Sequence, residues 1–195
     1  MFTVSDHTIK MLVEKQSKFI AHLIPYSMYA EVLKSLKDEH PKARHFVTAF
    51  RYINEFDQVV EGSSDDGEPK GTSGKPTLAV LQGQEMINVA VVVVRYFGGT
   101  KLGTGGLVRA YSDATNDVLE EGIFSTYEKH ERLEVTSLYS DVGRVDYALE
   151  QNAIGITEKF FETMGVRYVL HATAEKLEMF ETSVSRIIKI QEDKK

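Results

Sequence analysis

Five glycines and one lysine are concentrated in a nine-residue segment that follows a run of valines. Residues 98–106 read GGTKLGTGG, and residues 91–94 are all valine. Glycine leaves the main-chain N–H groups open to a ligand because it carries no side chain. A helix that begins here adds unpaired N–H groups and partial positive charge, which favour an anion. We therefore predict an anion-binding segment that contains Lys101 and the glycines Gly98, Gly99, Gly103, Gly105 and Gly106.

The spacing of these glycines differs from that of the common nucleotide-binding loops. A Walker loop ends in Lys followed by Ser or Thr, and residues 99–104 lack that ending. The dinucleotide pattern G-x-G-x-x-G begins at Gly103 but has Val108 in place of its third glycine. The alternative is a tight strand-to-helix connection whose glycines only permit close packing.

A second polar segment places three carboxylates within four positions, at Asp65, Asp66 and Glu68. Hard cations bind carboxylate oxygens, but this spacing does not match a calcium-binding loop of the EF-hand type. We expect instead that Asp66 shapes a turn with the following glycine. The three acids are expected to pair with basic residues, for which the candidates are Lys70, Lys75, Arg95 and Lys101. We predict neither a metal ion nor another cofactor.

Basic residues elsewhere in the first half of the chain extend the candidate anion site. They are Arg44, His45, Arg95, Lys101 and Arg109. If residues 63–75 lie beside the glycine segment, these side chains surround one phosphate-sized site, and Tyr96 and Phe97 offer faces on which a base can stack. The alternative is a set of separate ion pairs, such as one between Arg109 and Asp113 on a helix.

Composition limits the function more than it identifies it. The 195 residues include 42% hydrophobic and 27% charged residues, as in an ordinary soluble protein of one large or two small domains. Cysteine is absent, which excludes disulfides and fits a reducing cytosol. The net charge of −6 argues against a broad grip on nucleic acid, so any such contact must come from a local patch. Apolar runs are too short for a membrane span, and we expect a cytoplasmic protein without a membrane partner.

The apolar patterns predict alternating strands and helices. In the first half we expect strands at 18–25, 44–53 and 89–96, a helix that ends before Pro41, and a helix from the glycine segment to Gly122. Residues 54–76 are polar and predict one long loop. In the second half we expect strands at 132–138, 154–161 and 166–172 and helices at 142–151 and 176–188. This βαββα order, with a short last strand as an option, indicates a ferredoxin-like domain.

Four segments together resemble the IMPACT family, including its bacterial YigZ-type members. The matching segments are EKQSKFIAH at 14–22, KARHFVTAFRY at 42–52, SSDDGEPKGTSGKP at 63–76 and NVAVVVVRYFGGTKLGTGGLVRAY at 88–111. They span most of the first half, and the last two are highly specific strings. The second half contains no equally specific motif.

The resemblance implies an α+β protein with two domains. Residues 1–128 would fold as an α/β two-layer domain like the second domain of the fifth small-subunit ribosomal protein. Residues 129–195 would form the ferredoxin-like domain, similar to the last domain of elongation factor G. Eukaryotic relatives are linked to translational control through a partner of an initiation-factor kinase, using an additional domain that this sequence does not contain.

The leading hypothesis is a translation-associated regulatory protein that binds RNA, the ribosome or a translation factor without catalysis. The alternative is a phosphate-ligand or nucleotide-binding enzyme that uses residues 98–106. Co-sedimentation with ribosomes would favour the first hypothesis, and binding in equilibrium dialysis against nucleotides with magnesium would favour the second. No sequence feature identifies the oligomeric state.

Overall fold

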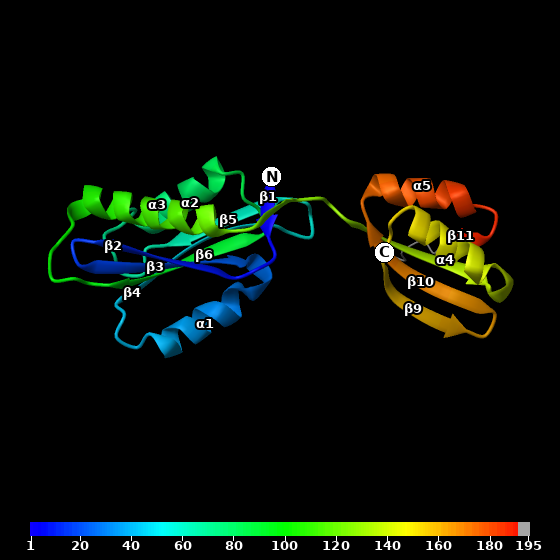
Figure 1. The fold of residues 1–195 in the computed structure, drawn as a ribbon, viewed down its shortest axis with the longest axis horizontal. Coiled ribbons are helices and arrows are strands. Elements are labelled where there is room, and N and C mark those ends of the chain that lie inside the picture. Colours follow the sequence, from blue (N-terminus) through cyan, green and yellow to red (C-terminus); the bar gives the residue numbers. More distant parts are fainter. Residues whose placement is uncertain (191–195) are drawn as a thin grey trace. The chain divides into compact units, whose positions relative to one another are not determined.

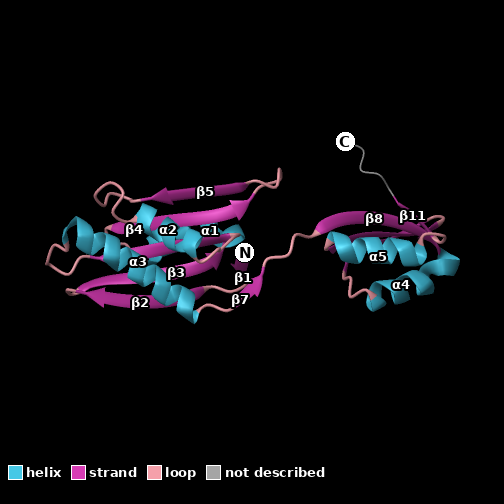
Figure 2. Cartoon of the chain, turned by 90° about the horizontal axis from the view of Figure 1, so that it is seen from above, coloured by secondary structure: helices cyan, strands magenta, loops and turns pink. Residues whose placement is uncertain are grey.

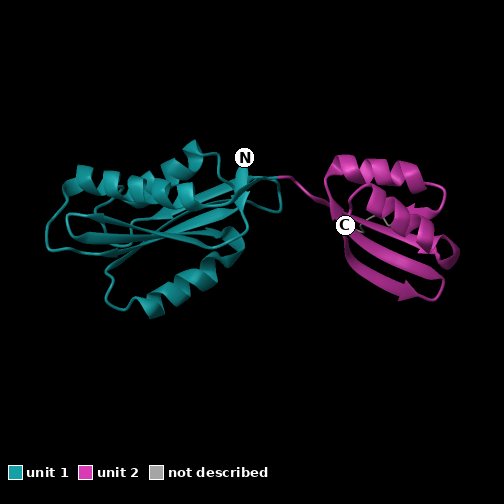
Figure 3. Cartoon of the chain, in the orientation of Figure 1, with its two compact units in different colours: residues 1–127 teal, residues 128–195 magenta. Residues whose placement is uncertain are grey.

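The structure, a computed structural model, describes residues 1–190 of the 195-residue chain. The chain divides into two compact units, Met1–Tyr127 (unit 1) and Glu128–Lys195 (unit 2), which Figure 3 draws in teal and magenta. The sequence predicts this division between residues 128 and 129. Both units combine antiparallel sheets with helices, so the predicted α+β class is confirmed. No helix within residues 1–190 is long and apolar enough to span a membrane.

Unit 1 is built on a five-stranded antiparallel sheet with the order β2-β3-β6-β4-β5. Its strands are β2 (Thr8–Glu14), β3 (Ser17–Pro25), β4 (His45–Ile53), β5 (Val59–Ser64) and β6 (Val89–Tyr96). The helices are α1 (Tyr29–Glu39), preceded by the short η1 (Tyr26–Met28), then α2 (Gly74–Gly83) and α3 (Gly103–Glu121). Strands β1 (Phe2–Val4) and β7 (Phe124–Thr126) pair in a separate two-stranded sheet.

Helices cover both faces of the large sheet. Figure 1 shows α2 and α3 on one face and α1 on the other, so α1 adds a layer to the expected two. This arrangement explains the valine run of β6. Val89, Val91 and Val93 pack toward α2 and α3, and Val92 and Val94 pack toward Leu36 of α1. A strand buried on both faces needs apolar side chains at every position.

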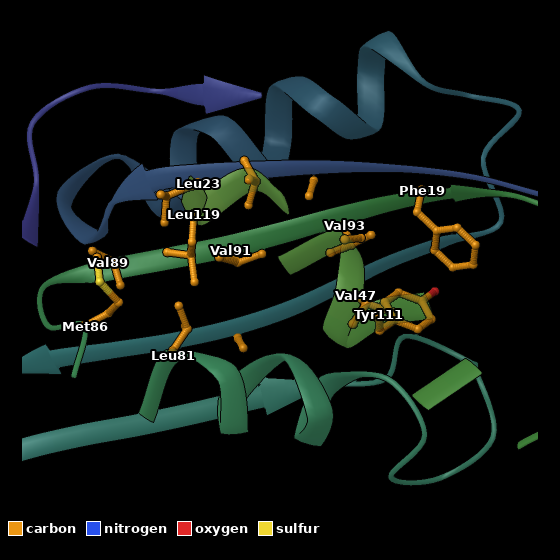
Figure 4. Packing of buried hydrophobic residues seen from close by; sticks show 14 of the residues in the cluster. Phe19, Leu23, Val47, Leu81, Met86, Val89, Val91, Val93, Tyr111 and Leu119 are labelled. Atoms are coloured by element: carbon orange, nitrogen blue, oxygen red, sulfur yellow. The ribbon is translucent and has the colours of Figure 1, made fainter. Parts of the chain in front are cut away.

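The main core of unit 1 lies between the sheet and helices α2 and α3. Figure 4 shows Phe19, Val47 and Val93 of the sheet facing Tyr111 of α3. The rings of Phe19 and Tyr111 meet edge to face, with their centroids 5.1 Å apart. This core fixes the position of α3, and therefore of the glycine segment at its start.

The expectation of one long loop over residues 54–76 is wrong. Residues 59–64 form strand β5, which pairs with β4 from Thr48 to Ile53, and α2 begins at Gly74. Figure 2 shows β5 at an edge of the sheet. An edge strand with one partner tolerates polar residues and glycine, so its pattern resembles that of a loop.

Unit 2 has the strands β8 (Glu131–Leu138), β9 (Ile156–Glu162), β10 (Gly165–Ala172) and β11 (Ile188–Ile190). The connecting helices are η2 (Tyr139–Asp141), α4 (Val142–Gln151) and α5 (Ala174–Val184). The antiparallel order β11-β8-β10-β9 is that of a ferredoxin-like βαββαβ sheet, with the short last strand present. The predicted helix at 176–188 ends earlier, at Val184, because the chain then turns into β11.

Candidate functional site

The glycine segment is half loop and half helix. Strand β6 ends at Tyr96, and α3 already begins at Gly103, so Gly105 and Gly106 lie in its first turn. The N-cap residue of α3 is Leu102, whose side chain cannot accept a hydrogen bond from the first turn. The first N–H groups of a helix have no acceptor within the helix itself. The start of α3 is therefore a helix end that no side chain of the described chain caps.

The glycines of this segment serve different purposes. The amide of Gly98 donates a hydrogen bond to the Ser17 hydroxyl at 3.1 Å, and a Cβ at this position would lie 2.1 Å from the backbone carbon of Gln16. Gly98 is thus a packing glycine. Gly99 and Gly103 have φ angles of +91° and +74°, which side chains rarely adopt, and a Cβ on either would meet nothing within 4 Å. Their main chain is open to the surroundings.

Exposed cations gather at the same end of unit 1 as the glycine segment. We call this group the basic end; it comprises Lys15, Lys18, Arg44, Lys101 and Arg109. Within residues 1–190, none of these side chains forms an ion pair or a hydrogen bond, so the alternative of an Arg109–Asp113 pair is not formed. Unpaired cations of this kind keep their charge available to an external anion.

Strand pairing brings the members of the basic end together. Lys18 pairs with Tyr96 across β3 and β6, and the amide of Arg44 donates to the carbonyl of Arg95 at 3.3 Å. Lys15 and Arg109 line one small cavity of about 170 Å³ beside Gly106. The acidic residues Glu14 and Asp113 also line that cavity.

Arg95 is the exception among the predicted basic residues, because it is buried. Its guanidinium forms an ion pair with Glu68, and both side chains are nearly inaccessible. The Tyr111 hydroxyl donates to the same carboxylate oxygen at 2.8 Å, and His45 Nε2 lies 3.9 Å from it. Burial raises the pKa of the Tyr111 hydroxyl, and the Glu68 charge raises it further. This cluster joins segment 65–73 to β6 and α3.

Asp65 caps helix α2 from a distance in the sequence. Its carboxylate accepts hydrogen bonds from the amides of Gly71 (2.7 Å), Ser73 (3.2 Å) and Gly74 (2.9 Å), and from the Ser73 hydroxyl (2.8 Å). Burial acts to raise the pKa of this carboxyl, but the four hydrogen bonds outweigh it and hold the pKa below its ordinary value. The start of α2 therefore receives its negative charge from within the chain.

Asp66 shapes the turn that the sequence predicts. Asp66 and Gly67 have φ angles of +43° and +86°, and the Glu68 amide donates to the Asp65 carbonyl at 3.0 Å, which defines a type I′ turn. The Asp66 carboxylate accepts from the Phe46 amide at 2.6 Å, and its carbonyl accepts from His45 Nδ1 at 2.8 Å. All three acids thus bind groups of the protein itself, and only Glu68 pairs with one of the candidate bases.

The structure therefore brings the predicted residues together in two groups. Arg95, His45 and the acids Asp65, Asp66 and Glu68 form an internal network. Arg44, Lys101, Arg109 and the open glycines lie at the surface of the same end of the unit. Within residues 1–190, no group of three His, Asp or Glu side chains is arranged to hold a metal ion.

The sequence patterns assigned no role in the site to four residues of this region. Ser17 anchors Gly98, Tyr111 anchors Glu68, and Lys15 and Lys18 add charge at the hairpin between β2 and β3. The alternation of TIKMLVE at 8–14 was the available signal for the hairpin, because it predicts a strand that pairs with β3. The roles of Ser17 and Tyr111 depend on contacts distant in sequence.

Comparison with known proteins shows to which family this chain is similar. Residues 15–119 match the Impact N-terminal domain family. A Haemophilus influenzae protein named as an IMPACT family member is 34% identical over 180 residues, which cover 88% of this chain and 84% of that protein. The IMPACT family member YigZ of Escherichia coli is 44% identical over 110 residues, or 55% of this chain and 54% of its own.

One solved structure matches both units. It is a crystal structure described as that of a hypothetical protein, with a TM-score of 0.73 and 28% sequence identity. The match covers 99% of this chain and 98% of the other.

Proposed function

The chain belongs to the IMPACT family, and from this premise we propose that it is a translation-associated regulatory protein of the cytoplasm that acts without catalysis. The contact with the translation machinery is made by the basic end of unit 1, which binds RNA on the ribosome. A translation factor is the competing partner, and the experiments below distinguish the two.

One observation carries this proposal: exposed, unpaired cations surround an uncapped helix start in an otherwise acidic protein. Lys101 and Arg109 flank the first turn of α3, and Lys15 shares a cavity with Arg109. The whole chain carries a net charge of −6, so this positive group is local. Phosphates are held by Lys and Arg side chains and by open amides at helix starts.

Phe97 gives the same surface an aromatic face. Its side chain is 43% exposed, and the guanidinium of the buried Arg95 lies 5.9 Å from the centre of its ring. A ring supported from one side and open on the other suits stacking with an unpaired base. This combination favours single-stranded or looped RNA over a uniform duplex.

The nucleotide-binding alternative receives less support from the geometry. Small-molecule sites usually enclose about 300–1,000 Å³. The cavity beside Gly106 measures about 170 Å³, and the acidic residues Glu14 and Asp113 are part of its lining. An open surface that follows a polyanion fits these dimensions better than a pocket for one nucleotide.

Sedimentation with ribosomes tests the proposed function. We expect the wild-type chain to travel with ribosomal particles at low salt and to be released as the salt concentration rises. The double variant Lys101→Glu, Arg109→Glu should stay at the top of the gradient. Lys34→Glu is the matched control, because Lys34 is an exposed, unpaired lysine on α1, on the other face of the sheet.

A wild-type chain that never leaves the top fractions at low salt would refute the proposed role. If the chain does co-sediment, binding to purified ribosomal RNA identifies the partner. Retention by naked RNA, lost in the double variant, supports the RNA contact. Co-sedimentation without any affinity for RNA would instead assign the surface to a protein partner.

A further inference from the structure

Unit 2 contains a cavity that the proposed function does not use. It measures about 370 Å³, within the range of sites for small organic molecules. Strand register explains its position: Leu138 pairs with Gly165, Gly165 pairs with Glu162, and Ile188 pairs with Ser137. The end of β8, the β9–β10 turn and the start of β11 therefore meet at one end of the sheet, and the cavity lies there.

Two cations line this cavity without a partner. Arg186 and Lys189 belong to the lining, and within residues 1–190 neither side chain forms an ion pair or a hydrogen bond. Because nothing in the described chain compensates their charges, the cavity is able to attract an anion.

Each of the two carboxylates in the same lining is paired with an arginine outside it. Asp141 pairs with Arg144 at 3.2 Å, and Glu162 pairs with Arg167 Nε at 2.8 Å. Neither Arg144 nor Arg167 is part of the lining. The acids therefore leave Arg186 and Lys189 free to meet an external charge.

A buried hydroxyl and several apolar side chains complete the cavity. Ser137 belongs to the lining and is 5% exposed, and its hydroxyl interacts with that of Tyr168. The side chains of Leu138, Met164 and Ile187 supply apolar surface. Of these, Leu138 is 57% and Met164 77% exposed, which leaves apolar area at the surface for a ligand to cover.

We propose that this cavity binds a small organic anion that combines one acidic group with a compact apolar body. Arg186 and Lys189 hold the acidic group, and Leu138, Met164 and Ile187 cover the apolar part. The acidic group is a carboxylate or a phosphate monoester, which share anionic oxygens that accept hydrogen bonds from both cations. An RNA backbone fits less well, because it would leave the apolar side chains exposed.

Amide chemical shifts of the full chain give the test. Benzoate and phenyl phosphate are the probes, benzyl alcohol is the uncharged control, and inorganic phosphate is the control without an apolar body. We expect saturable shifts from at least one of the two probes at residues 137–141, 164–166 and 186–189. Each control should bind about tenfold more weakly or worse, because it lacks one half of the recognition. The stronger of the two probes identifies the acidic group.

Matched variants localise the effect. The double variant Arg186→Gln, Lys189→Gln should lose about tenfold or more in probe affinity, since it removes both charges. Lys176→Gln is the control, because Lys176 is a cation of the same unit outside this cavity. The proposal is overturned if neither probe shifts these amides or if the double variant binds the probes as well as the wild type does.

Discussion

Two polar segments lie at the same end of unit 1, and their charged groups have opposite fates. Segment 65–73 directs its acidic groups inward: Asp65 caps α2, and Glu68 binds the buried Arg95. In segment 97–106, the lysine and the helix start have no side-chain partner within the described chain: Lys101 is unpaired, and α3 begins without a side-chain cap. Both segments carry glycines at a helix start, so glycine content alone does not separate them.

The difference shows what distinguishes a structural segment from a candidate binding surface. A helix start attracts negative charge in either case. At α2 the chain supplies that charge itself through Asp65, and at α3 no described residue does. We infer that the first segment stabilises the fold and that the second faces a partner.

The largest effect is expected from breaking the buried pair. Arg95→Met leaves the Glu68 carboxylate buried without its cation, which should lower the free energy of unfolding of unit 1 by about 3–5 kcal/mol. Chemical denaturation followed by the NMR signals of unit 1 measures this. The double variant Arg95→Met, Glu68→Gln should recover a large part of the loss, because the uncompensated charge is gone. A loss below about 1 kcal/mol in the single variant would show that the pair does not stabilise unit 1.

The next effect distinguishes a packing glycine from an open one. Gly98→Ala places a Cβ 2.1 Å from the backbone of Gln16, so one of the two segments must move. We expect a loss of about 1–3 kcal/mol in the free energy of unfolding, as for other overpacked sites. An unchanged stability would mean that the hairpin between β2 and β3 moves away without cost.

Removal of the α2 cap should have a smaller effect that depends on pH. Asp65→Asn keeps the shape but loses the charge, and we expect a cost of about 1–2 kcal/mol at neutral pH. The pKa of Asp65 is lowered in the folded protein, so its contribution is complete above the ordinary carboxyl pKa of 3.8. It disappears as the pH falls through the folded-state value. The difference in the free energy of unfolding between wild type and variant should therefore become smaller below pH 3.8. A difference that does not change with pH would exclude the Asp65 charge as its cause.

The smallest expected effect is an increase in the free energy of unfolding. Gly105 lies in the first turn of α3 with no heavy atom within 4 Å of an added Cβ, so Gly105→Ala should raise the free energy of unfolding by about 0.5–1 kcal/mol. Gly103→Ala is the contrast, because its φ of +74° strains any other residue and should lower stability. Thermal unfolding of the two variants compares them directly.

Local patterns predicted much of this fold. The apolar run at 89–94, which ends in four valines, predicted β6, and the helical pattern after the glycine segment predicted α3. The sequence of unit 2 predicted its strands and helices because each carries a clear period of its own. The turn at Asp66 was also predictable, since Asp followed by Gly favours positive φ angles.

The remaining features depend on contacts distant in the sequence. Strand β5 was missed because its pairing with β4, rather than its polar composition, makes it a strand. Arg95 was correctly placed among the candidate partners of the acids, but its burial beneath Phe97 is a property of the packed sheet. The distribution of Arg44, Lys101 and Arg109 at one end became visible only when the strands were placed side by side.

The salt dependence of RNA binding tests the central claim most directly. The logarithm of the association constant with a ribosomal RNA fragment should fall linearly with the logarithm of the salt concentration. In the variant Lys101→Glu, Arg109→Glu, the affinity should drop by about tenfold or more and the slope should become shallower, while Lys34→Glu retains both wild-type values. An unchanged affinity and slope in the double variant would contradict the account, because the outward-facing segment would then carry no part of the contact.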